Sequence, residues 1–374
     1  MGRPAGGEHV RSPRCAARFL SAALREEGAI RYKMGGLERF LGLMGRFRSG
    51  VGMAPAAAVL LVVVPLAVPS VQAVASAAKT TTTFSISTSP VSVHGYGMSL
   101  FVTETDGAKT ASLTVTFSIT GTTARHPTQT HSYSFSLPAG ALDVAAGLAG
   151  ASVDTGTGMA KQGAIAMALK KLGDIQVARD ACGTTKTRTG TLKGAFKLVA
   201  DTAFFHTVKE SALPATLTKR VATPGCGQTS SPCTPGTTLS ASNSKRHMFL
   251  NATRTPVPTG GATVSEFLSY VQSPTATAPA TISHLIKVSG APKKALSPSA
   301  DLTSAALNGS VGKPYLTGGV AFSGTPTSGA CSKTLNRTIS TGTVTGKLVA
   351  HFDSVGDRGF TAGKKVPATL IQTG

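Results

Sequence analysis

The sequence is poor in aromatic and charged residues: it contains no Trp and 5 Tyr, and 14% of its 374 residues are charged. Thr and Val lose side-chain freedom in a helix and Gly loses backbone freedom, so a chain rich in Thr, Ser, Gly and Val disfavours long helices. Apolar types still make up 41% of the chain, which is enough for a packed core. The composition therefore predicts strands.

Acidic residues are scarce, with 16 Asp and Glu against 37 Lys and Arg, which gives a net charge of +21. Beyond residue 77 the chain keeps 27 basic and 12 acidic groups, a net charge of +15. Such a surface attracts polyanions, which include wall polymers, anionic lipid headgroups and nucleic acid, through long-range fields that salt screens. The alternative interpretation is that the charge only maintains solubility.

The Lys and Arg residues are scattered along the sequence rather than clustered. No Arg-rich helix, RNA-stacking aromatic motif or zinc finger accompanies them, which argues against nucleic acid as the partner. The adjacent basic pairs are Lys170-Lys171, Lys219-Arg220, Lys245-Arg246, Lys293-Lys294 and Lys364-Lys365.

A secretion signal is predicted at residues 44–77. Arg46 and Arg48 precede the apolar run 56–64, and small residues follow it, which is the three-part order of a cleavable signal. Cleavage after Ala73 or Ala77 fits. A membrane anchor is the alternative, but a spanning helix needs about 20 apolar residues, and two prolines interrupt the end of this run.

Residues 1–43 are polar, Arg-rich and oddly placed before a signal sequence. We interpret them as the product of a start codon assigned too early, with Met44 as the initiator and Met34 as the second choice, or as a disordered extension. We therefore expect a secreted or cell-envelope protein with no stable transmembrane span after cleavage.

Beyond Lys79 the apolar residues alternate with Ser and Thr, which places every second side chain on one face of a sheet. Residues 113–119 and 133–137 are typical. The run Ala160 to Leu172 is rich in good helix formers, but its counterpart later in the chain, 316–322, is interrupted by Gly and cannot form a helix. Both runs are predicted to be strands.

A tandem duplication accounts for these counterparts. The passage from Ala181-Cys182 to Pro214-Ala-Thr-Leu217 returns in the same order from Ala330-Cys331 to Pro367-Ala-Thr-Leu370, at an offset of 149 to 153 residues. Upstream, 82–87 parallels 237–242.

We therefore predict an all-β protein of two modules, 78–222 and 237–374, joined by a Pro- and Gly-rich linker at 223–236. Each module is expected to be a β-sandwich, and a lipocalin-like barrel is the alternative. Residues 181–202 resemble a module in uncharacterised secreted proteins of high-GC Gram-positive bacteria. The resemblance covers about 60 residues in each copy and implies no activity.

Asp154-Thr155-Gly156 is similar to the signature of aspartic proteases, which are also secreted, bilobal and all-β. That chemistry requires a second carboxylate from the other lobe. The corresponding stretch is Ala306-Leu307-Asn308-Gly309, which lacks one. Asp154 is better interpreted as a turn residue at a strand end, and we expect Asp154→Asn to leave any activity unchanged.

The remaining candidates for chemistry are isolated side chains. His126 and His131 are five residues apart and would lie on opposite faces of a strand, so no metal site is expected. Phe204-Phe205 could line a ligand pocket but fits a core and rim position. No nucleophile elbow, phosphate loop, dinucleotide fingerprint or zincin helix occurs in the sequence. We therefore expect no enzyme and no cofactor.

Four cysteines follow the signal: Cys182, Cys226, Cys233 and Cys331. In an oxidising compartment they should pair, and three connectivities are possible. Because Cys182 and Cys331 occupy equivalent positions, we expect the pairs Cys182–Cys226 and Cys233–Cys331. The competing pattern joins Cys226 to Cys233 and Cys182 to Cys331 across the modules.

Three functions remain open. The first is a non-catalytic surface protein that binds anionic polymers or other proteins. The second is a lipocalin-like carrier of an apolar molecule, which would need a cavity of a few hundred Å³. The third is a hydrolase that uses Asp154.

Overall fold

The structure is a computed structural model that describes residues 80–121, 123, 126–200, 206–223, 233–332, 335–361 and 363–374. All of them belong to one compact unit, Val74–Gly374. The predicted signal at 44–77 and the residues before it lie outside the described residues. No helix in the described part of the chain is long and apolar enough to cross a membrane.

The protein is all-β, as predicted. The strands of the first half are β1 (Thr81–Thr88), β2 (Val91–Val93), β3 (Tyr96–Thr105), β4 (Thr110–Ile119), β5 (Thr128–Pro138), β6 (Leu142–Val144), β7 (Ala151–Asp154), β8 (Gly163–Lys170), β9 (Ile175–Asp180), β10 (Gly183–Val199) and β11 (Thr207–Ala222). The strands of the second half are β12 (Gly236–Asn243), β13 (Met248–Pro256), β14 (Ala262–Gln272), β15 (Thr281–Pro292), β16 (Leu296–Pro298), β17 (Ser304–Asn308), β18 (Leu316–Ala330), β19 (Asn336–Phe352), β20 (Gly356–Gly359) and β21 (Val366–Thr373). Short 3-10 helices connect some of them: η1 (Ala146–Leu148), η2 (Ala160–Gln162), η3 (Ser244–Arg246), η4 (Lys293–Ala295) and η5 (Gly309–Gly312).

The same order of antiparallel pairings occurs in both halves. In the first half the neighbours run β6-β7-β8-β10-β11-β1-β3-β4-β5. In the second they run β16-β17-β18-β19-β21-β12-β13-β14-β15. The run that could have been helical forms η2 and then β8, so the prediction of a strand there is confirmed.

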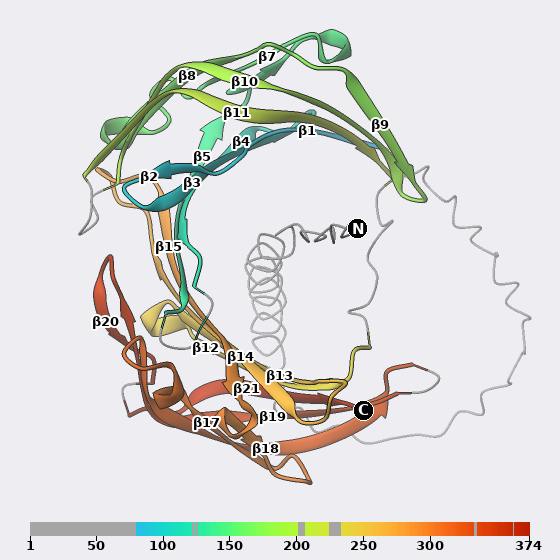
Figure 1. The fold of residues 1–374 in the computed structure, drawn as a ribbon, viewed down its shortest axis with the longest axis vertical. Helices are drawn as coiled ribbons and strands as arrows, with labels where there is room; N and C mark the ends of the chain where they lie inside the picture. Colours follow the sequence, from blue (N-terminus) through green and yellow to red (C-terminus); the bar gives the residue numbers. More distant parts are fainter. Residues whose placement is uncertain are drawn as a thin grey trace, which may run out of the picture. The chain divides into compact units, whose positions relative to one another are not determined.

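In each half the sheet folds over a core of its own. Figure 1 shows β7, β8 and β10 in one layer of the first half, above β1, β3 and β4 in the other. Alternate residues of these strands, such as Leu113, Val115 and Phe117, are completely buried between the layers. The second half has a separate buried cluster that includes Leu239, Leu250 and Phe322.

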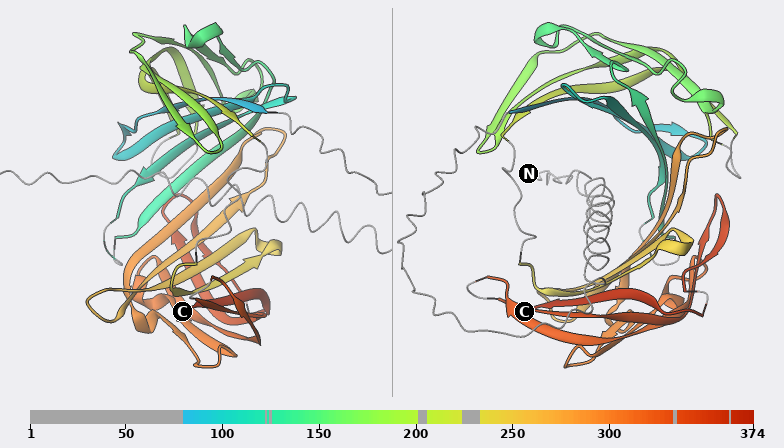
Figure 2. Two further views of the ribbon diagram at one scale, coloured as in Figure 1. Left: turned by 90° about the vertical axis from the view of Figure 1, so that its right-hand side faces the viewer. Right: turned by 180° about the vertical axis from the view of Figure 1, so that it is seen from behind.

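The two halves are joined by the pairing of β5 with β15. Seven residue pairs, from Thr281 opposite Ser134 to Lys287 opposite Thr128, extend the sheet from one half into the other. Figure 2 shows these strands running alongside each other where the two halves meet. The sheet is not closed into a barrel, which removes the closed lipocalin-like alternative. The continuity of the sheet was not predicted.

A disulfide joins Cys233 to Cys331, with their Cα atoms 5.9 Å apart, and ties the start of the second half to the end of β18. This is the pair expected for the second module. Cys182 is also disulfide-bonded. Its expected partner, Cys226, lies outside the described residues.

Glu266 on β14 is an exception to the apolar core. It is fully buried between Ala252 of β13 and Val288 of β15, and neither carboxyl oxygen has a hydrogen-bond partner. Burial raises the pKa of Glu266 to about 8. The counterpart of Glu266 in the first half is Leu113. Phe117 opposes His131 in the way that Tyr270 opposes His284, and Leu113 and Glu266 each lie four residues before these aromatic residues.

We predict that Glu266→Leu raises the unfolding free energy at pH 7 by at least about 2 kcal/mol, since it removes a buried polar group without a partner. Because the folded-state pKa lies above the unfolded value near 4.5, wild-type stability from this group is complete below pH 4.5 and is lost as the pH rises towards 8. Denaturant titrations at several pH values measure both effects. Glu266→Gln is the control: it should abolish the pH effect while keeping the shape of the side chain, and an unchanged pH dependence would contradict the interpretation.

Candidate functional site

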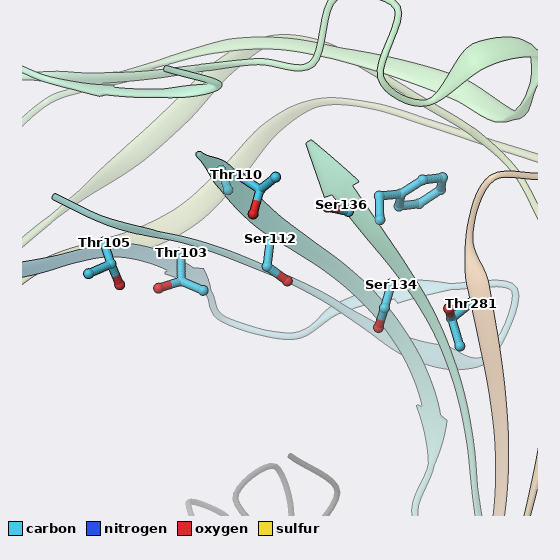
Figure 3. A pocket seen from close by; sticks show the side chains of 9 residues that line it. Thr103, Thr105, Thr110, Ser112, Ser134, Ser136 and Thr281 are labelled. Atoms are coloured by element: carbon cyan, nitrogen blue, oxygen red, sulfur yellow. The ribbon is translucent and has the colours of Figure 1, made fainter. Parts of the chain in front are cut away.

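The face of the sheet that points away from the core carries mainly hydroxyl groups on β1, β3, β4, β5 and β15. Cross-strand rows such as Thr103–Ser112–Ser136 and Phe101–Thr114–Ser134–Thr281 follow from the pairing register. An open depression of about 400 Å³ lies on this face, across the junction of the two halves. Figure 3 shows the hydroxyl side chains of Thr103, Ser112, Ser134 and Thr281 around it.

The outer face of β8, β10 and β11 is different in character, because it carries four exposed lysines: Lys170, Lys193, Lys197 and Lys209. Each follows a buried residue in its strand, so its side chain lies on the side opposite the core. Lys197 stands directly opposite Lys209, and Lys170 opposes Thr191, two residues before Lys193. We call these four residues the lysine track.

The track therefore corrects the interpretation that the basic residues are scattered. Its members are 39 positions apart at most, yet the register brings them onto three neighbouring strands. The acidic groups in its surroundings are Glu210, which follows Lys209 on β11 opposite the buried Phe196, and Asp143 and Asp154 on β6 and β7. Among the described residues no ion pair involves any of the four lysines.

A buried polar network occupies the core side of the β5–β15 junction. The Nδ1 atoms of His131 and His284 are 2.9 Å apart, and both rings are almost completely buried. His284 Nε2 lies 3.2 Å from Gln272 Oε1, an acceptor, so the proton of His284 is on Nε2. His131 must then donate from Nδ1 to His284.

The surroundings of the two rings keep them neutral. Burial lowers the pKa of His131 to about 4, against the opposing effect of Asp353. Burial, helped by His131 and Arg358, lowers the pKa of His284 to about 3. Tyr270 stacks on His284 with ring centroids 5.8 Å apart, and the Arg358 guanidinium lies over the Tyr270 ring, 5.1 Å from its centroid.

Asp353 links this network to the second half of the chain. Gln129 donates to Asp353 Oδ2, and the Asp353 backbone N–H donates to Gln129 Oε1 at 3.2 Å. Ser354 Oγ lies 3.0 Å from His284 Nδ1. Burial, followed by the charge of Asp353, raises the pKa of Tyr96 to about 12. The network thus connects β5 and β15 to the turn after β19.

We predict that the junction weakens in acid. Both histidines have folded-state pKa values below the ordinary 6.5, so their contribution to stability is complete above pH 6.5 and is lost as the pH falls towards 4. The loss is of the order of 3 kcal/mol for one imidazole. Between pH 7 and pH 4, the free energy of unfolding should fall more steeply with decreasing pH for wild type than for the His131→Gln/His284→Gln variant. The exposed His126→Gln serves as the control, and equal slopes in all three proteins would refute the assignment.

The residues singled out in the sequence lie apart from one another. Asp154 is an exposed turn residue whose Oδ1 accepts from the Gly156 N–H at 2.9 Å. Asn308 forms the same turn in the second half, accepting from the Ser310 N–H at 3.1 Å. His126 is exposed in the loop before β5, whereas His131 is buried. Phe204 and Phe205 lie outside the described residues.

His284 was missed by sequence reasoning, which treated it as an isolated residue. One signal could have found it: His131 and His284 are 153 positions apart, within the range of offsets of the predicted duplication. The described residues hold no group of three or more His, Cys, Asp and Glu that could bind a metal ion.

Comparison with known proteins adds little. No family model matches the chain, and no curated protein matches it. Among solved structures it is similar to the crystal structure of NE1406 from Nitrosomonas europaea, provisionally called AttH, at 9% identity. The match covers 79% of this chain and 92% of that one, but its TM-score of 0.24 is too low to support any argument.

Proposed function

We propose that the protein is a non-catalytic, exported protein whose first half binds phosphate-bearing polymers of the cell envelope. The lysine track is the observation that supports this proposal. Four cations on three neighbouring strands, none of them in an ion pair within the part of the chain that the structure describes, offer a row of charges that a flexible polyanion can follow.

The lysine track also lowers the stability of the fold, which a role in solubility alone does not explain. Like charges directly opposite each other on a sheet are destabilising, and Lys197 faces Lys209 in that way. Alanines at 164, 166, 168, 195 and 212 surround the lysines and leave their ammonium groups uncovered. A face that only maintained solubility would mix both signs of charge.

Two alternatives receive less support. A carrier of an apolar molecule needs an apolar cavity, whereas the depression at the junction is lined mainly by Ser and Thr. A hydrolase that uses Asp154 needs a second carboxylate beside it, and Asp154 instead closes a turn.

The track predicts a salt-dependent affinity for polyphosphate. Binding of long-chain inorganic polyphosphate to the full chain, measured by titration calorimetry, should weaken at least 10-fold in Lys197→Glu/Lys209→Glu. Lys293→Glu/Lys294→Glu removes the same charge from the second half and should change the affinity less than 2-fold. An equal loss of affinity in both variants would mean that only the net charge of the protein matters, which would contradict the proposal. Binding whose affinity does not depend on salt would contradict it as well.

Export is the second part of the proposal, and the Cys233–Cys331 disulfide supports it because such bonds persist in oxidising compartments. We expect the secreted chain to begin at Val74 or Ala78. N-terminal sequencing and intact mass of secreted material test this. Recovery of the chain only in membranes, with residues 59–64 retained, would overturn it.

A further inference from the structure

We infer that the depression on the hydroxyl face is a second binding site, and that it takes an uncharged, polyhydroxylated ligand: a glycan chain. The site is distinct from the lysine track and does not rest on the function proposed for it. Its lining comes from β3, β4, β5 and β15, so both halves of the chain contribute.

The lining has no charged side chain. It consists of seven Ser and Thr residues together with Ala111 and Phe135. A charged ligand would lose its hydration there without gaining a counter-charge, which is costly. Hydroxyl groups, by contrast, both donate and accept hydrogen bonds and match the hydroxyls of a sugar.

Three of the seven lining hydroxyl groups already have partners in the protein. Thr103 donates to the Phe84 backbone carbonyl at 3.2 Å, Thr105 pairs with Thr83 at 3.3 Å, and Ser134 pairs with Thr114 at 3.2 Å. Among the described residues the side chains of Thr110, Ser112, Ser136 and Thr281 have no hydrogen-bond partner. These four groups remain available for a ligand.

Phe101 supplies the apolar element of the site. Its ring is 46% exposed, an unusual position for such a side chain, and it lies on the same face, directly opposite Thr114 and two residues from Thr103. The apolar face of a sugar ring can pack on an aromatic ring while its hydroxyls reach the neighbouring side chains. The four strands span about 15 Å at the usual strand spacing, so an extended oligosaccharide can lie across them.

The experiment uses the full chain and three uncharged probes: the hexasaccharides of cellulose, chitin and maltose. We expect titration calorimetry to detect binding of at least one of them with an affinity that salt does not change. Ser112→Ala/Ser136→Ala should weaken that binding at least 5-fold, and Phe101→Ala should do the same. Ser136→Trp, which fills the depression from an exposed position, should abolish it.

The matched control is Ser265→Ala/Ser289→Ala, which removes the two serines at the corresponding positions of β14 and β15 in the second half. It should leave the affinity unchanged, and so should Lys197→Glu/Lys209→Glu. An equal loss in the serine control, or no binding of any probe, would overturn the inference. If the protein bound a glycan but not polyphosphate, only the function proposed for the lysine track would be contradicted. The two proposals can therefore be refuted independently.

Discussion

The pairing of β5 with β15 is the constraint on which the rest of the molecule depends. It makes one sheet of two halves that each have a core of their own, and it does so by a register of seven residue pairs. A shift of one residue would turn every side chain of one strand to the other face. A shift of β5 would take His131 off the core side and Ser134 off the outer face, and a shift of β15 would do the same to His284 and Thr281. The buried histidine contact and the depression are thus two consequences of one register.

The same register separates two kinds of chemistry. On the core side, neutral imidazoles, amides and the Asp353 carboxylate hydrogen-bond to one another in a small buried network, in which His131 Nε2 has no partner among the described residues. On the other side, some Ser and Thr side chains pair with each other, whereas Thr110, Ser112, Ser136 and Thr281 in the lining of the depression have no partner among the described residues. Rigid support on one face and free hydroxyls on the other suit a site that binds without rearrangement.

Much of the local structure could be predicted, because the period-two alternation of residues such as Leu113, Val115 and Phe117 directly encodes a half-buried strand. What could not be predicted is register. The sequence match of 82–87 with 237–242 aligns Ile86 with Ala241. In the structure, however, Ile86 opposes Leu217 and Leu239 opposes Leu370, so the counterpart of Ile86 is Leu239, two residues before Ala241. The lysine track was missed for the same reason, since its members are neighbours only across strands. The joining of the halves was missed because Pro and Gly at 223–236 marked a boundary and no local signal marked β5 and β15 as partners.

The two halves share their pairings but not their surfaces, and this asymmetry bears on function. Lys193 opposes Ala168 in the first half, and Thr345 opposes Ala321 at the same place in the second. Lys170 opposes Thr191, and Ser323 opposes Thr343. The scaffold needs neither lysine, because the second half forms the same strands with hydroxyl residues there. Structural demand therefore does not account for the lysine track, and its cross-strand repulsion would favour its loss. A cluster that costs stability in one half and is absent from the other is better explained by a ligand than by the fold.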